Sequence, residues 1–120
     1  MNFKTDKADE LFSLYIRKRD KNTCVRCHRI FAEGERGLSC AHYFGRGKES
    51  TRFDPENCDA MCYPGCHLYW QNEARDEYTE FKIKQLGQKR YDLLVLRAHT
   101  TKKKDRKMER IIWKKALEEL

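Results

Sequence analysis

Two closely spaced pairs of cysteines constrain this chain more than any other feature. Cys24 and Cys27 are separated by two residues, and Cys62 and Cys66 by three residues that include a Pro-Gly dipeptide. Such spacing lets two thiolates converge on one ion, and Pro-Gly favours the tight turn between them. Together the two pairs predict a tetrahedral structural zinc site that closes the loop between Cys24 and Cys66.

The remaining cysteines, Cys40 and Cys58, have no close partner in the sequence. A free cysteine often packs as a small buried hydrophobe, and this interpretation suits these two best. The first twenty residues lack the apolar run and cleavage site of a signal peptide. We therefore expect a cytoplasmic protein whose cysteines bind metal and form no disulfides. No segment has the roughly 18 to 20 apolar residues of a membrane span, so no membrane partner is expected.

Length and charge set limits on the core and on the partners. At 120 residues, 38% of them charged, the chain suits one domain with a thin core. The zinc site would supply part of the missing cohesion. A formal net charge of +7 favours polyanionic partners such as DNA, although a merely solvated basic surface would give the same number.

Hydrophobic periodicity and turn residues predict an α+β fold. We expect an N-terminal helix, then short strands and loops, then two or three helices, with Gly87 as a helix stop. One domain would cover 1–120, with its core at 20–87 and a helical extension at 88–120. The expected helices are Asp6 to Arg19, Leu68 to Leu86, Lys89 to about His99 and Met108 to Leu120.

Two segments between the cysteine pairs carry a recognisable motif. They read CAHYFGRG at 40–47 and TRFDPEN at 51–57, and His67 directly follows the second pair. Their order of His, Asn and His resembles the HNH nucleases, and more closely the NinG (Rap) recombination nucleases of lambdoid phages. The resemblance runs from about Cys24 to Gly87. It implies a ββα-metal core, and cleavage of DNA that leaves 5′-phosphate and 3′-hydroxyl ends.

The resemblance also implies roles for three residues. His42 matches the general base, and a neutral imidazole with a pKa near 6.5 suits that task. His67 would bind a catalytic divalent ion, Mg²⁺ or Mn²⁺, that holds the scissile phosphate. Asn57 would ligate the same ion or hold the loop that carries His42. Many HNH enzymes place a metal ligand just before the base, but here Ala41 stands there, as a small residue does in the NinG-like relatives.

Other interpretations of the same residues remain open. Asp54, Asp59 or a water molecule could complete the metal shell. His67 could instead be a zinc ligand, His42 a structural histidine, and Asn57 a turn residue. His28, which follows Cys27, is expected at the surface.

Basic residues supply candidate contacts to DNA phosphates. Arg46 and Lys48 lie in a glycine-punctuated loop after His42, and Arg52 follows nearby. A basic tail would add affinity that depends on salt but not on base sequence. The tail residues are Lys102, Lys103, Lys104, Arg106 and Lys107. Tyr69, Trp70 and Trp113 stand at helical spacing and are expected in the core rather than stacked on bases.

The sequence therefore predicts a metal-dependent endonuclease acting on duplex or branched DNA, with recombination intermediates as one substrate class. Two alternatives stay open. One is a zinc-containing DNA-binding module without catalysis, favoured by Ala41. The other is a zinc-stabilised protein-interaction domain that docks a partner through the C-terminal helix. An exposed helix at that end is also compatible with a homodimer.

Overall fold

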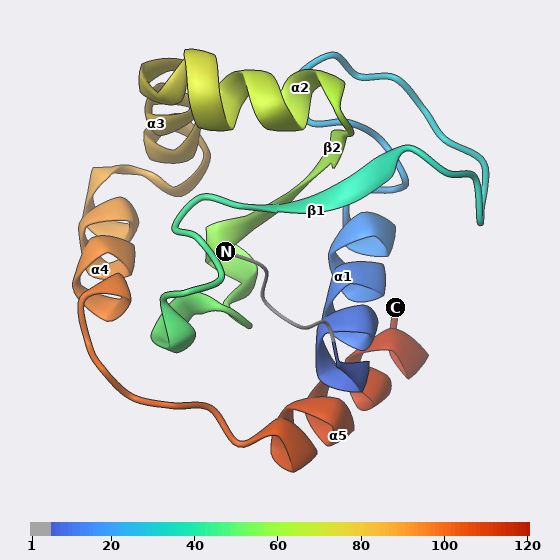
Figure 1. The fold of residues 1–120 in the computed structure, drawn as a ribbon, viewed down its shortest axis with the longest axis vertical. Coiled ribbons are helices and arrows are strands. Elements are labelled where there is room, and N and C mark those ends of the chain that lie inside the picture. The colour runs from blue at the N-terminus through green and yellow to red at the C-terminus, as the bar shows by residue number, and fades with distance from the viewer. Residues whose placement is uncertain (1–5) are drawn as a thin grey trace.

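The computed structural model describes residues 6–120. A two-stranded hairpin lies at the centre, with helices on both of its faces (Figure 1). Short 3₁₀ turns, η1 (Glu49–Thr51) and η2 (Pro55–Asn57), occupy the connection between the strands. The remaining elements are α1 (Lys7–Arg19), β1 (Leu38–His42), β2 (Cys58–Cys62), α2 (Gly65–Leu68), the π turn η3 (Tyr69–Glu73), α3 (Arg75–Leu86), α4 (Gln88–Ala98) and α5 (Arg106–Glu118). The predicted α+β class is confirmed.

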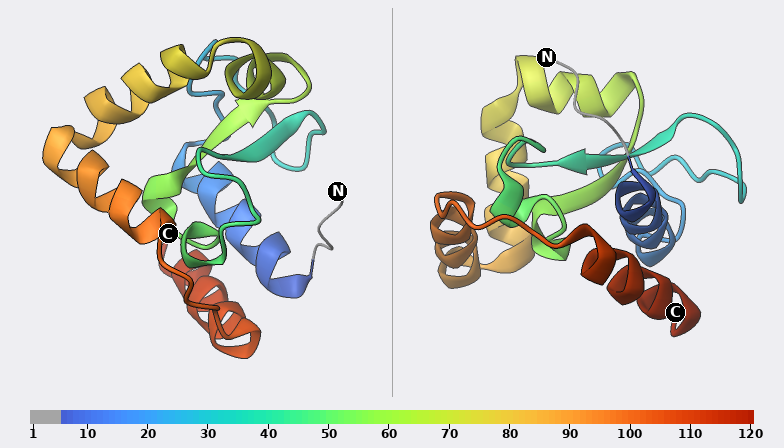
Figure 2. Two further views of the ribbon diagram at one scale, coloured as in Figure 1. Left: turned by 60° about the vertical axis from the view of Figure 1, so that its left-hand side comes forward. Right: turned by 60° about the horizontal axis from the view of Figure 1, so that its bottom comes forward.

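The hairpin is antiparallel and its register runs from Leu38 opposite Cys62 to His42 opposite Cys58. Side chains alternate between the two faces of a strand, so Cys40 and His42 share one face while Ser39 lies on the other. The face with Cys40 and His42 is covered by α1. The short helix α2 lies on the opposite side of the hairpin from α1 (Figure 1 and Figure 2).

Each face of the hairpin has its own small core. Phe12 and Ile16 of α1 pack with Phe53 and Cys58 on one side. On the other side Ala41, Met61, Trp70, Tyr78 and Leu94 form a second buried cluster. Two thin cores separated by one hairpin agree with the expectation that burial alone holds only part of this fold.

The N-terminal helix forms as its sequence predicts. Asp6 accepts a hydrogen bond from the Asp9 amide at 3.1 Å, and the Asp9 carboxylate accepts one from the Asp6 amide at 3.1 Å. This reciprocal capping box fixes where the helix begins. Ala8, Phe12 and Ile16, spaced four residues apart, are its buried stripe.

The C-terminal helices differ from the prediction in two places. The expected helix through Leu68 to Leu86 is interrupted at Ala74, whose φ of −131° and ψ of 55° are not helical, and the π turn η3 precedes this break. The last helix is not a lone exposed one. Trp113 of α5 packs on Phe12 of α1, with ring centroids 4.8 Å apart, and all views place α5 beside α1. Across residues 6–120, no helix combines the length and apolar character that crossing a bilayer needs.

Candidate metal centre and active site

The two cysteine pairs converge as their spacing predicts. Cys24 and Cys27 follow α1, Cys62 ends β2 and Cys66 lies in α2, and the four Sγ atoms all lie within 4.8 Å of one another. The Cys27 and Cys62 sulfurs are 3.9 Å apart. A tetrahedral zinc ion with Zn–S bonds of about 2.3 Å requires sulfurs about 3.8 Å apart, so this cluster fits a structural zinc ion.

Local backbone geometry prepares these sulfurs for a metal. The Cys27 amide points at the Cys24 sulfur over 3.5 Å, and the Cys66 amide points at the Cys62 sulfur over 3.3 Å. Burial alone would raise the pKa of Cys24, but backbone hydrogen bonds outweigh it and lower that pKa to about 7. Any side chain at Gly65 would bring its Cβ to 3.2 Å from the Cys62 sulfur, so the glycine keeps that sulfur accessible.

A basic side chain also borders the cluster. Arg26 donates to the Cys66 sulfur over 3.4 Å and lies over the Tyr69 ring at 4.4 Å. Burial raises the pKa of Cys66 to about 12 in the absence of metal, although the contact with Arg26 opposes this. Four thiolates on one Zn²⁺ carry a net charge of −2, which Arg26 partly offsets.

His67 adjoins the cysteine cluster in sequence but turns toward β1. Its Nδ1 lies 2.6 Å from the Ser39 hydroxyl, and that hydroxyl donates to the Met61 carbonyl at 2.9 Å. Because the single hydroxyl hydrogen is used for Met61, Nδ1 must donate to Ser39, which leaves a lone pair on Nε2. His67 is thus available for an ion, although not as a member of the four-cysteine cluster. His28 is exposed, as expected.

His42 ends β1 and lines a cavity of about 450 Å³ between α1 and that strand. Its Nε2 lies 2.9 Å from the Arg52 carbonyl, an oxygen that can only accept, so Nε2 carries the hydrogen and Nδ1 keeps its lone pair. Burial lowers the pKa of His42 to about 4, and the nearby positive charge of Arg46 acts in the same direction. The imidazole is therefore neutral at cellular pH.

Asn57 is fully buried and holds the loop that follows His42. Its Oδ1 accepts from the Phe44 amide at 2.8 Å, and its Nδ2 donates to the carbonyls of Phe44 at 2.9 Å and Thr51 at 3.1 Å. This arrangement matches the loop-holding role among the two expected for Asn57. Asn57 Oδ1 is buried and already accepts a hydrogen bond, so it is not exposed to bind a metal ion.

The structure does not bring His42 and His67 to one point. His67 contacts Ser39, three residues before His42, and at about 3.3 Å per residue these positions are roughly 10 Å apart along β1. Ser39 and His42 also point to opposite faces of β1. Even so, a positive charge on His67 is near enough to lower the pKa of His42.

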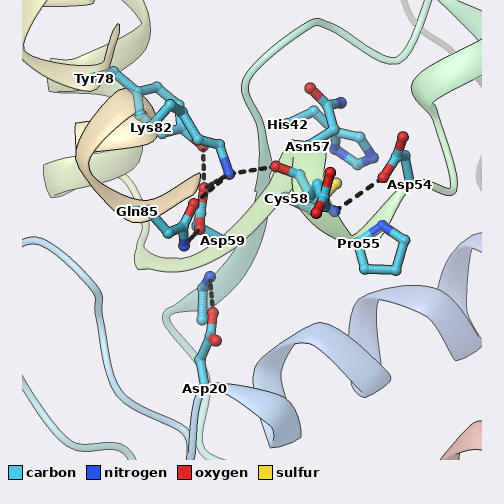
Figure 3. A network of polar contacts seen from close by, with 12 residues as sticks. Asp20, His42, Asp54, Pro55, Asn57, Cys58, Asp59, Tyr78, Lys82 and Gln85 are labelled. Carbon is cyan, nitrogen blue, oxygen red and sulfur yellow. Dashed lines mark hydrogen bonds and ion pairs between the residues drawn. The ribbon is translucent and has the colours of Figure 1, made fainter. Parts of the chain in front are cut away.

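Neither of the two acidic residues considered for the metal shell is free. Asp59 is fully buried and bound by Tyr78 at 2.9 Å, Lys82 at 2.9 Å and Gln85 at 2.8 Å (Figure 3). Asp54 caps η2 and pairs with Arg97 at 2.7 Å. Both carboxylates hold the fold together.

The predicted phosphate contacts divide into two groups. Arg46 lines the cavity, Lys48 is exposed, and the tail residues Lys102 and Lys103 are exposed with Lys104 half-buried between α4 and α5. Arg46 also forms an ion pair with Asp9 at 3.3 Å. Arg52 is more deeply buried, because it is only 6% exposed and donates two hydrogen bonds of 2.9 and 2.5 Å to Asp9. This burial argues against the expected phosphate contact and makes Arg52 the anchor of α1.

The aromatic residues also lie largely where expected. Trp70 is 5% exposed and Trp113 is 7% exposed, so both belong to the core, whereas Tyr69 is 39% exposed beneath Arg26. Sequence reasoning missed Asp9, whose only local signal was its place in a capping box. It also missed the proximity of Cys40, His42 and Cys58, whose side chains form a second candidate metal-binding group.

The fold and the cysteine cluster together define a small α+β protein with a candidate zinc centre and a cavity that His42 lines. Residues 2–120 match the family described as bacteriophage lambda NinG protein, so the chain belongs to this phage recombination-associated family. Neither the curated proteins nor the solved structures include a significant match.

Proposed function

We propose that this protein is a metal-dependent DNA endonuclease that hydrolyses phosphodiester bonds, with His42 as the general base. The observation that carries the proposal is a neutral imidazole of fixed tautomer at a cavity lined by Arg17 and Arg46 together with Asp9 and Glu10. Membership of a phage recombination-associated family supports DNA as the substrate, and branched recombination intermediates are the substrate class that suits it. The reaction would take place in the cytoplasm of the host cell.

The task of His42 follows from its hydrogen bond. With Nε2–H held by the Arg52 carbonyl, Nδ1 is the nitrogen that can take a proton from water. A pKa of about 4 makes this a weak base in the free protein. A bound phosphodiester would bring negative charge beside the ring, which favours the imidazolium and raises the pKa of His42 toward cellular pH.

The residues present fit a catalytic divalent ion only in part. His67 offers the free lone pair of Nε2, while Asn57 and Ala41 offer none. Such an ion, bound to His67 with phosphate oxygens and water, would neutralise the phosphate and stabilise the leaving 3′ oxygen, provided that the phosphate and the attacking water together span the roughly 10 Å between the Ser39 and His42 positions of β1. Ser39 is the positioning residue for His67, because its hydroxyl fixes the tautomer.

The net positive charge of the chain and the exposed lysines near the site support binding of DNA, although Arg46 also pairs with Asp9 at 3.3 Å. Arg46 and Lys48 follow His42 closely, and the exposed Lys102 and Lys103 lie in the segment between α4 and α5. With a formal net charge of +7, the chain would attract the backbone of any sequence and lose affinity as salt rises.

The test is cleavage of a supercoiled plasmid and of a synthetic four-way junction with Mg²⁺ or Mn²⁺. His42→Gln keeps an N–H that can bond to the Arg52 carbonyl but cannot accept the proton, so cleavage should fall by about 100-fold or more. His99→Gln, which changes an exposed histidine at the end of α4, is the matched control and should cut normally. Preference for the junction would identify the substrate class.

A DNA-binding module without catalysis is the second candidate. Ala41, at the position before His42, is fully buried in a core cluster and offers no ligand to an ion. Zinc-loaded wild-type protein that binds both substrates but cuts neither, at any metal concentration, would establish this alternative and refute the nuclease.

A further inference from the structure

A second group of metal-binding side chains lies on the face of the hairpin that α1 covers. Cys40, His42 and Cys58 each present one ligand atom, and these three atoms lie within 4.8 Å of one another. The register explains their proximity, because His42 pairs directly with Cys58, and Cys40 stands two residues earlier on the same face of β1. The proposed nuclease chemistry uses neither sulfur.

We propose that Cys40, Cys58 and His42 form a second zinc site, distinct from the four-cysteine centre. Two thiolates and one imidazole are ligands that Zn²⁺ prefers. A tetrahedral ion needs these atoms about 3.5 to 3.8 Å apart, and all three already lie within 4.8 Å of one another. The ion would have three protein ligands and one open position.

The hydrogen bond of His42 orients it for such an ion. A histidine that binds a metal through one nitrogen commonly donates its other N–H to a backbone carbonyl, which fixes the tautomer. His42 has this arrangement, since Nε2–H donates to the Arg52 carbonyl at 2.9 Å. Nδ1 is thus the nitrogen left for zinc, and no change of tautomer is needed.

Access and charge also suit this site. Cys40 and His42 line the cavity of about 450 Å³, whereas Cys58 lies fully buried behind them. The cavity gives zinc a path from solvent and room for a water molecule as the fourth ligand. Two thiolates and Zn²⁺ sum to zero net charge, which a partly buried site accommodates more easily than an isolated ion.

One consequence rests on the proposed nuclease function. The second zinc ion and the general base would both require the lone pair of His42 Nδ1. Zinc at this site and cleavage are then mutually exclusive, so excess zinc should inhibit an enzyme that Mg²⁺ or Mn²⁺ supports, and a chelator that removes only the weaker zinc should restore cleavage.

The first test is the number of zinc ions bound by the full chain, kept reduced and titrated with zinc under native mass spectrometry. We expect two ions per folded wild-type chain, the second weaker than the first. Cys40→Ala should bind one. Ser13→Ala, which changes a cavity residue with no soft ligand, should still bind two. A single zinc ion in the saturated wild type, or two in Cys40→Ala, would overturn the proposal.

Cobalt gives an independent measure of the ligands. Thiolate-to-cobalt absorption should rise in two steps, the first from the four sulfurs of the cysteine cluster and the second from Cys40 and Cys58. Only the second step should vanish in Cys40→Ala. Cys40 is half-buried, so this variant should keep its fold, which thermal unfolding can verify. A second cobalt without added thiolate absorption would refute the ligand set.

Cleavage assays then separate this proposal from the nuclease proposal. Inhibition by excess zinc that is present in the wild type and absent in Cys40→Ala supports the shared nitrogen. Cleavage that continues with two zinc ions bound contradicts it. A protein that never cuts refutes the nuclease, while the zinc stoichiometry still decides whether the second site exists.

Discussion

The buried ion pair between Lys82 and Asp59 gives the sharpest test of how the helices hold the hairpin. Both side chains are fully buried, and their charged groups are 2.9 Å apart. The Lys82 ammonium also donates to the Glu56 carbonyl at 2.6 Å and to Gln85 at 2.8 Å, so all three of its hydrogens are used (Figure 3). The pair joins α3 to β2 and to the turn before it.

Lys82→Met keeps most of the side-chain volume but leaves the buried Asp59 carboxylate with Arg19, 4.0 Å away, as its remaining cation. Removing one partner of a buried pair costs about 3–5 kcal/mol, a large part of the roughly 5–15 kcal/mol that stabilises a typical domain. Tyr78 and Gln85 still donate to Asp59, so we expect the lower half of this range. Adding Asp59→Asn to Lys82→Met removes the stranded charge and should restore part of the stability.

The assay is urea unfolding followed by circular dichroism, with zinc held in excess so that the cysteine cluster stays filled. Lys84→Met is the matched control, because Lys84 is an exposed lysine of the same helix, and it should change stability by no more than about 0.5 kcal/mol. A destabilisation below about 1 kcal/mol for Lys82→Met, or a double variant less stable than Lys82→Met alone, would refute this account of the network.

Three further predictions concern zinc, pH and salt. A strong chelator should unfold the domain at 25 °C, because a structural zinc ion contributes on the order of 10 kcal/mol; a chelated protein with an unchanged melting temperature would contradict this. Burial would raise the pKa of Asp9, but the hydrogen bonds and charge of Arg52 lower it below its usual value. The ion pair therefore stabilises the fold above about pH 4 and less as pH falls through the folded pKa, and Asp9→Asn should flatten stability curves between about pH 5 and 2. Replacing lysines 102–104 with glutamine should weaken DNA binding and lower the slope of log K against log salt by up to about 0.9 for each phosphate that these lysines neutralise; an unchanged slope would place the phosphate-binding residues elsewhere.

Features set by local spacing were predictable from the sequence. The four-cysteine cluster follows from two short cysteine pairs, and α1 follows from a capping residue and an apolar stripe at Ala8, Phe12 and Ile16. The residues of the α1 stripe are four positions apart, and the two cysteine pairs are joined by the tetrahedral geometry that one zinc ion requires. The role of Asn57 was predictable only as two alternatives, because the hydrogen-bond partners of its side chain, Phe44 and Thr51, lie 13 and 6 residues away.

Features that depend on distant partners were not predictable. Arg52 reads as a phosphate contact until Asp9, 43 residues earlier in the chain, is known to neutralise it. The proximity of Cys40 to Cys58 required the strand register, which nothing in the connection between the strands specifies. The break at Ala74 has no Gly or Pro to mark it, so the residue types alone do not indicate that the helix is interrupted there.

Arg52 interacts with two parts of the molecule through two different groups. Its side chain holds Asp9 of α1, and its main-chain carbonyl holds the His42 imidazole. Any fluctuation that lifts α1 from the hairpin therefore loosens the segment that restrains the ring, so the rotational freedom of His42 depends on the dynamics of a helix that is distant in the chain. Because α5 packs on α1 through Trp113, motions of both the N-terminal and the C-terminal helix would affect the rotational freedom of the His42 imidazole.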